Sequence, residues 1–259
     1  MFRGVWDPDR YLTFAGQRAR PFTDLIAQVA ADPGTVAEVA DLGCGPGTLT
    51  VGLARRWPGA HVVGVDSSAQ MIAATPADPP AGVEFVHADL RDWAPERPVD
   101  VLLSNATLQW VPGHLELLAR LAGHVAPGGW LAFQIPGNFA EPAHVLLREL
   151  AAGDRWPALH DLERPSAHEP AAYLDALLDL GLAADVWETT YVQLLQGDDA
   201  VLEWMSGTGL RPYLAALSGA ERDVFVAEYR DLLRTAYPPG PHGTVLPYRR
   251  IFAVGRKPA

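Results

Sequence analysis

The sequence contains a single cysteine, Cys44, and no long apolar run. One cysteine excludes an internal disulfide and any zinc site built from several thiolates, and we expect no metal site. No stretch approaches the roughly 18 consecutive apolar residues of a membrane-spanning helix. Residues 1–7 also lack the apolar core of a signal peptide. We therefore expect a cytoplasmic protein without a membrane partner.

Positive charge is scarce as well. The chain has 20 Lys and Arg against 31 Asp and Glu, which gives a formal net charge of −11. Nucleic-acid binding requires clustered Lys and Arg, so this balance argues against a nucleic-acid partner. About half of the 259 residues are apolar, enough for a large core. We expect a single domain over residues 1–259, and no protein partner is evident.

Short apolar runs alternate with segments of helical periodicity. Strands are predicted at about 37–42, 61–66, 83–86, 99–103, 130–135, 185–194 and 250–255. Helices are predicted from Arg20 to about 31, and at about 47–57, 67–73, 115–125, 141–152, 169–180 and 198–236. Strands alternating with helices imply right-handed crossovers. The predicted fold class is α/β: a Rossmann-like, seven-stranded, mostly parallel sheet flanked by helices, with a helical insertion before the last strand.

That insertion separates the last two predicted strands by roughly 50 residues, whereas a tight hairpin needs only a few. The spacing of Ser218 and Glu221 is typical of a helix-capping box within it. We expect residues from about 195 to 240 to form a helical cap beside the sheet. Such additions usually shape substrate pockets.

A glycine loop, Asp41-Leu-Gly-Cys-Gly-Pro-Gly47, follows the first predicted strand. In an open parallel sheet this turn lies beyond the carboxyl ends of the strands, where ligands bind. Its spacing is G-x-G-x-G, whereas dinucleotide-binding loops use G-x-G-x-x-G. Pro46 also removes a backbone donor where a pyrophosphate would bind. The loop therefore disfavours a dehydrogenase.

Three acids surround the same edge. Asp66 ends the second strand and can accept hydrogen bonds from ribose hydroxyls, Asp89 can accept from an adenine amine, and Asp41 can orient a positively charged group. Together they would repel a pyrophosphate but suit a sulfonium and an ammonium, which indicates S-adenosyl-L-methionine. The expected cofactor-binding residues are Asp41, Gly43, Cys44, Gly45, Asp66, Ser67, Asp89, Leu90 and Asn105.

The loop, with Asp66 and Asp89, resembles the class I S-adenosylmethionine-dependent methyltransferases over residues 35–136, the predicted cofactor-binding core. A narrower resemblance, to the trans-aconitate 2-methyltransferase family, covers nearly the whole chain. It is carried by residues 6–11, 18–21, 105–110, 134–138, 141–144, 187–191, 208–212 and 247–252. This resemblance implies a methyl ester formed on a carboxylate of a small tricarboxylic acid, first of all trans-aconitate.

Methylation of a carboxylate needs no general base, because the unperturbed pKa of a carboxyl is near 4. We therefore expect no catalytic side chain and assign catalysis to alignment and electrostatics. An anionic substrate needs local positive charge, and Arg18, Arg20, Arg211, Arg249 and Arg250 flank or follow the core. The expected substrate-binding residues are Tyr11, Arg18, Gln109, Trp110, His144, Tyr191, Arg211 and Arg249.

Two alternatives remain open at this point. The chain could methylate another small metabolite, or it could bind S-adenosylmethionine without catalysis. Turnover on a panel of acids distinguishes them, because a non-catalytic binder predicts binding with no product.

Overall fold

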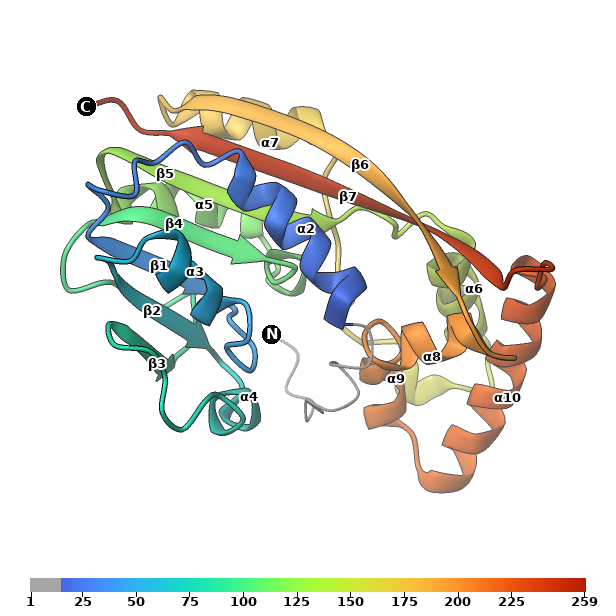
Figure 1. Ribbon diagram of the computed structural model, residues 1–259. Helices are drawn as coiled ribbons and strands as arrows, with labels where there is room; N and C mark the ends of the chain where they lie inside the picture. The colour runs from blue at the N-terminus through green and yellow to red at the C-terminus, as the bar shows by residue number, and fades with distance from the viewer. Residues whose placement is uncertain (1–14) are drawn as a thin grey trace.

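The computed structural model describes residues 15–259, with side chains from residue 19 onward. Seven strands form one sheet in the order β3-β2-β1-β4-β5-β7-β6 (Figure 1). Their bounds are β1 Glu38–Leu42, β2 His61–Asp66, β3 Val83–His87, β4 Val99–Asn105, β5 Val125–Pro136, β6 Ala183–Leu195 and β7 Thr244–Arg256. The first five strands pair in parallel, whereas β7 runs antiparallel to both β5 and β6. The predicted Rossmann-like, mostly parallel sheet is confirmed.

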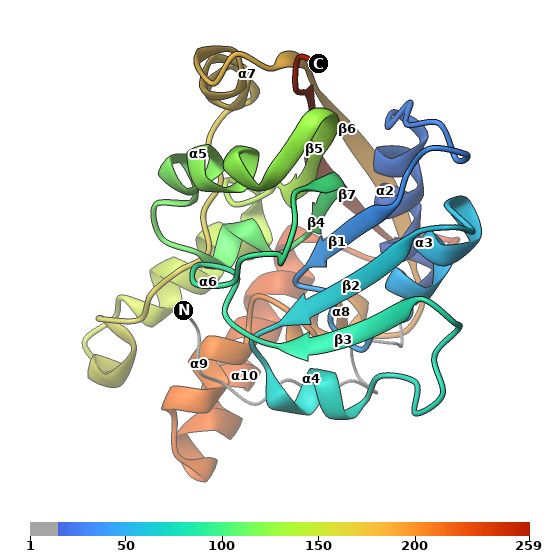
Figure 2. The same cartoon turned by 90° about the vertical axis from the view of Figure 1, so that its left-hand side faces the viewer.

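Helices cover both faces of this sheet, as Figure 2 shows. The helices are α2 Ala15–Ala27, α3 Thr50–Arg56, α4 Ala69–Ala73, α5 His114–His124, α6 Pro142–Ala151, α7 Pro170–Asp179, α8 Ala200–Ser206, α9 Arg211–Ala216 and α10 Gly219–Ala236. One core lies between the sheet and α5 and α7, around Leu118 and Tyr173. The other lies between the sheet and α2 and α3, around Leu25 and Trp57. Both faces are therefore buried, as the apolar strands of a parallel sheet require.

A third apolar cluster lies at one end of the sheet. Helices α6, α8, α9 and α10 pack there around Trp204, Phe225 and Tyr229 (Figure 1). The predicted capping box at Ser218 and Glu221 begins α10. Helices α8–α10 form the segment between β6 and β7 where the sequence predicts a helical cap. That this segment shapes a substrate pocket stays a prediction.

Several boundaries differ from the sequence prediction. Helix α2 begins at Ala15 rather than Arg20 and contains Pro21, so the proline does not start it. Strand β7 begins at Thr244, several residues before the predicted start, because it pairs with β6 along that strand's whole length. Pairing between distant segments, which local sequence does not report, fixes the start of β7. Among residues 15–259, no helix combines the length and apolar character needed to cross a membrane.

Candidate functional site

The glycine loop lies at the carboxyl end of β1. Gly43 and Gly45 have φ of 80° and 57°, in the left-handed region that favours glycine. A Cβ on Gly43 would lie 2.0 Å from Oγ1 of Thr107, so glycine is required there for packing. A Cβ on Gly45 would meet nothing within 4 Å, so this stretch of backbone is open to a ligand.

Asp66 closes the loop from the end of β2. Its two carboxylate oxygens accept hydrogen bonds from the backbone N–H of Gly45, at 2.9 Å, and of Ser68, at 2.8 Å. Burial raises the pKa of Asp66 above its ordinary value. Each oxygen has a second lone pair, so Asp66 can still accept hydrogen bonds from ligand hydroxyls.

Asp41 is the most buried acid of this edge, with 3% of its surface exposed. It accepts a hydrogen bond of 2.6 Å from the Thr50 hydroxyl, and burial raises its pKa to about 6. Within the described part of the chain no Lys, Arg or His forms an ion pair with it. A cationic ligand group beside Asp41 would favour its charged form.

The other predicted cofactor residues lie along the same edge. Asp89 follows β3, and its hydrogen bonds with the Arg91 guanidinium lower its pKa. The carbonyl of Ser67 lies 3.1 Å from Nε2 of His87, and Leu90 is buried in the core facing α5 and α7. Burial raises the pKa of the Cys44 thiol, which keeps that thiol protonated and unsuited to nucleophilic attack. Direct contact of these residues with a cofactor stays a prediction.

A short segment connects the loop to a neighbouring pocket. Thr107 Oγ1 lies 3.4 Å from the Gly43 carbonyl, against which the threonine packs. The preceding residue, Ala106, has φ of 54°, uncommon for a residue with a side chain. Its N–H donates to the Gln134 carbonyl at 2.8 Å, and its carbonyl accepts from Nε2 of Gln109 at 2.6 Å. Such strain persists only where surrounding bonds enforce it, and it concentrates at functional sites.

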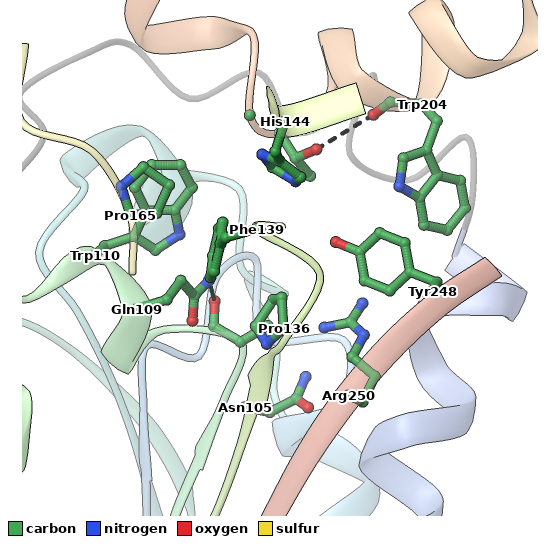
Figure 3. A pocket seen from close by; sticks show the side chains of 13 residues that line it. Asn105, Gln109, Trp110, Pro136, Phe139, His144, Pro165, Trp204, Tyr248 and Arg250 are labelled. Atoms are coloured by element: carbon green, nitrogen blue, oxygen red, sulfur yellow. Dashed lines mark hydrogen bonds between the residues drawn. The ribbon is translucent and has the colours of Figure 1, made fainter. Parts of the chain in front are cut away.

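The pocket lies between the ends of β4 and β5 and the helical cluster (Figure 3). It is lined by Asn105, Ala106, Gln109, Trp110, Pro136, Phe139, His144, Pro165, Trp204, Thr208, Gly209, Tyr248 and Arg250. The structure therefore brings together three predicted substrate residues, Gln109, Trp110 and His144, with the predicted cofactor residue Asn105. Most of the remaining wall is aromatic or apolar, as in many small-molecule sites.

Polar side chains from three adjacent strands lie on one face of the sheet at this pocket, and two of them, Asn105 and Arg250, line it. Asn105 on β4 pairs in register with Gln134 on β5, and Pro136 on β5 pairs with Arg250 on β7. Directly paired residues point to the same face, and so do residues two apart in one strand. Asn105, Gln134 and Arg250 therefore share one face near the carboxyl ends of β4 and β5.

Arg250 is the notable charge in the pocket. Only 6% of its surface is exposed, yet among the described residues no carboxylate lies within 4.0 Å of it. Its Nη1 donates to Oε1 of Gln134 at 3.2 Å, and its guanidinium carbon lies 4.4 Å from the centre of the Tyr248 ring. A buried cation without an anion is costly, so this position favours an anionic ligand.

His144 lines the wall opposite Arg250, as Figure 3 shows, and the centroids of its ring and the Phe139 ring lie 5.0 Å apart. Burial, with a smaller contribution from Arg148, lowers its pKa to about 4. The imidazole is therefore neutral at pH 7, and it can donate or accept a hydrogen bond but adds no charge.

Two predicted substrate residues lie away from this pocket. Arg249 points to the face opposite Arg250, because neighbouring residues of a strand alternate. Its guanidinium is bound by Glu188, at 2.9 Å from Nε, and by Glu169, at 2.6 Å from Nη2. Tyr191 is buried against α2, where its hydroxyl donates to Asp24 at 2.6 Å and its ring lies under Arg20. Neither Arg249 nor Tyr191 lines the pocket.

The remaining predicted residues lie at its margin or beyond the description. Arg211 begins α9 just after the lining residues Thr208 and Gly209, but does not itself line the pocket. Tyr11 and the side chain of Arg18 lie outside the described residues. Two lining residues, Tyr248 and Arg250, are not among the expected substrate-binding residues. Alternation along the strand is the signal that distinguishes Arg250 from Arg249, because it puts the two side chains on opposite faces of the sheet.

Comparisons with known proteins agree with this geometry. A family model described as a methyltransferase domain matches residues 39–129. The trans-aconitate 2-methyltransferase of Streptomyces avermitilis is 55% identical, over 98% of this chain and 97% of that protein. The enzyme of the same name from Mycobacterium tuberculosis is 46% identical, over 96% of each chain.

Solved structures show the same fold at low identity. The YcgJ protein from Bacillus subtilis aligns with a TM-score of 0.61 at 14% identity, over 93% of this chain and 99% of that one. Phosphoethanolamine N-methyltransferase 2 from Haemonchus contortus, solved with S-adenosylhomocysteine, aligns with a TM-score of 0.56 at 18% identity, over 93% of this chain and 53% of that one.

Proposed function

Since this chain belongs to the trans-aconitate 2-methyltransferase family, we propose that it methylates a carboxylate of a small tricarboxylic acid, trans-aconitate in the first place, with S-adenosyl-L-methionine as the methyl donor. The single observation that carries the substrate class is Arg250, a buried cation that faces the pocket and has no carboxylate partner among residues 19–259.

The residues at the glycine loop fit this cofactor. When bound, it supplies a methyl group on a positively charged sulfur, open to attack by a nucleophilic oxygen. Gly45 leaves room for close approach, Asp66 retains acceptor capacity for ribose hydroxyls, and the buried carboxylate of Asp41 suits a positively charged ligand. These are acceptor and anionic groups, which match a cationic nucleoside and would oppose a pyrophosphate.

The pocket's residues fit the second reactant. A substrate carboxylate is ionised at neutral pH, so no side chain has to remove a proton. The task of Arg250 is to hold the anion, and that of the apolar wall around Trp110 and Phe139 is to exclude water from it. His144, neutral at pH 7, can hydrogen bond to the substrate without acting as a base. Correct alignment alone can contribute roughly 7–11 kcal/mol to catalysis.

Turnover of the purified protein tests this proposal. We would incubate it with S-adenosyl-L-methionine and, separately, trans-aconitate, cis-aconitate, citrate and isocitrate, and identify products by mass and NMR. A methyl ester of trans-aconitate is the expected product, formed faster than any other.

Other outcomes would reject it in identifiable ways. Cofactor binding without an ester from any of the four acids would indicate a non-catalytic binder. Faster methylation of cis-aconitate, citrate or isocitrate than of trans-aconitate would reject trans-aconitate as the preferred substrate.

A further inference from the structure

Two adjacent arginines of β7 have opposite electrostatic surroundings. Arg249 is neutralised by the carboxylates of Glu169 and Glu188 on one face of the sheet. Arg250, on the other face, has the amide of Gln134 as its hydrogen-bond partner. The amide accepts a hydrogen bond but carries no charge, so the positive charge of Arg250 is not cancelled within the described residues.

The bond to Gln134 leaves one nitrogen of the guanidinium for a ligand. Gln134 is fully buried in β5 and its Oε1 accepts from Nη1, while the guanidinium carbon lies over the Tyr248 ring. Within the described chain neither Nε nor Nη2 makes a hydrogen bond, and because Nε is enclosed by protein atoms, Nη2 is the nitrogen that a ligand in the pocket can reach. Figure 3 shows the guanidinium directed into the pocket beside the Tyr248 hydroxyl. Nη2 can donate a charge-assisted hydrogen bond to one oxygen of a carboxylate.

Two further polar atoms on this face of the sheet lack a hydrogen-bond partner. They are Oδ1 of Asn105 and Nε2 of Gln134, both buried among residues 19–259. Buried polar atoms are nearly always satisfied in folded proteins, so the polar network around Gln134 is incomplete within the described chain.

We propose that Gln134 is a positioning residue for substrate binding, which holds Arg250 through an uncharged acceptor so that its Nη2 and its full charge serve one carboxylate of the substrate. This inference rests on the proposed function. A glutamate at position 134 would have nearly the same shape and would keep the hydrogen bond, but it would form an internal ion pair with Arg250. The pocket would then have no net charge to offer an anion.

The test compares two substitutions of Gln134 that separate charge from shape. Gln134→Glu should raise the KM for trans-aconitate about tenfold or more, because the internal carboxylate competes with the substrate. Gln134→Met keeps a neutral chain of similar length, loses the hydrogen bond and should raise KM only about two- to fivefold. The Kd for S-adenosyl-L-methionine should change less than about twofold in both variants, because the cofactor loop is untouched.

Glu188→Gln serves as the matched control. It removes one carboxylate that pairs with Arg249 on the other face of the sheet, so the KM of this variant for trans-aconitate should stay near the wild-type value. A purely structural role for Gln134 predicts the reverse order, with Gln134→Glu nearly normal and Gln134→Met impaired, and that order would overturn the inference. The proposed function is tested separately, by turnover of the four acids with the wild-type protein. If the wild type forms the ester but the two Gln134 variants show the reverse order of KM, the inference fails while the proposed function stands.

Arg250→Lys tests the guanidinium independently of how Gln134→Glu folds. Lysine keeps the positive charge but lacks the planar guanidinium that binds Gln134 and a substrate oxygen in a fixed geometry, so the KM for trans-aconitate should rise about tenfold or more. An unchanged KM would show that Nη2 of Arg250 does not bind the substrate.

Discussion

Replacing Arg250 by glutamine should strongly reduce turnover of trans-aconitate, whereas the same change at Arg249 should have a small effect. Truncating one partner of a buried, hydrogen-bonded charge pair costs about 2–5 kcal/mol of binding free energy. At about 1.4 kcal/mol for each factor of ten, kcat/KM should fall by about 30- to 4,000-fold for Arg250→Gln. Arg249 lies on the opposite face, bound to two partly exposed glutamates, so its loss removes ion pairs worth about 0–1 kcal/mol each.

The two variants also differ in their expected stability. Arg250 has no carboxylate partner among residues 19–259, so in the absence of substrate its burial is unfavourable. Arg250→Gln should therefore keep a Tm at or above that of the wild type while it loses activity. The assays are initial rates with varied trans-aconitate at saturating cofactor, the Kd of the cofactor, and thermal unfolding.

Three results would refute this reasoning. Equal losses of kcat/KM in the two variants would show that position on the sheet face does not decide substrate binding. A parallel loss of Tm and activity in Arg250→Gln would assign the residue a structural role. A rise in cofactor Kd of the same size as the rise in KM would place Arg250 at the other ligand.

Other predictions concern the loop and the buried titratable groups. Gly43→Ala should lower the Tm of the ligand-free protein strongly, since its Cβ would lie 2.0 Å from Thr107, whereas Gly45→Ala should cost only left-handed strain of about 1 kcal/mol; thermal unfolding without cofactor compares them, and equal losses of Tm would contradict the packing argument. Burial raises the pKa of Asp41 from 3.8 to about 6, so the folded protein binds this proton more tightly than the unfolded chain, and the free energy of unfolding falls as pH rises through that interval. Asp41→Asn should therefore stabilise the ligand-free protein at pH 7.5 by up to about 3 kcal/mol while weakening cofactor binding, and urea unfolding that shows no gain would contradict this. Burial lowers the pKa of His144 from 6.5 to about 4, so the free energy of unfolding should fall as pH drops through that interval. His144→Gln should reduce this pH dependence, measured by urea unfolding at several pH values. An unchanged dependence on pH would show that His144 protonates freely in the folded state.

Much of the cofactor half could be predicted because its determinants are close together in the sequence. The glycines follow a buried strand, and Asp66 ends the next strand in line. In a parallel sheet, successive strand ends meet at one edge, so local patterns suffice to place them. The same reasoning could not see that Asp89 is bound by Arg91, because hydrogen bonding between side chains depends on their conformations.

The substrate half was predictable only in outline. The sequence indicates that arginines are needed and names the adjacent pair Arg249 and Arg250, but choosing between them requires knowing which face of β7 meets the pocket. That face is set by pairing with β5, in which Pro136 lies opposite Arg250. The place of Tyr191 has a related cause, because its hydroxyl donates to Asp24 of α2, a residue from a distant part of the chain.

Local order along the chain thus determined the fold class, the glycine loop and its acidic rim, since these follow from strand and helix periodicity and from backbone geometry. Tertiary structure alone decided which of the adjacent arginines, Arg249 or Arg250, forms ion pairs with carboxylates of the described chain. Charge neutralisation depends on distances between side chains from β5, β6, α7 and β7, and strand register sets those distances. A shift of one residue in β7 would exchange the faces of Arg249 and Arg250, while the composition of the chain would stay the same.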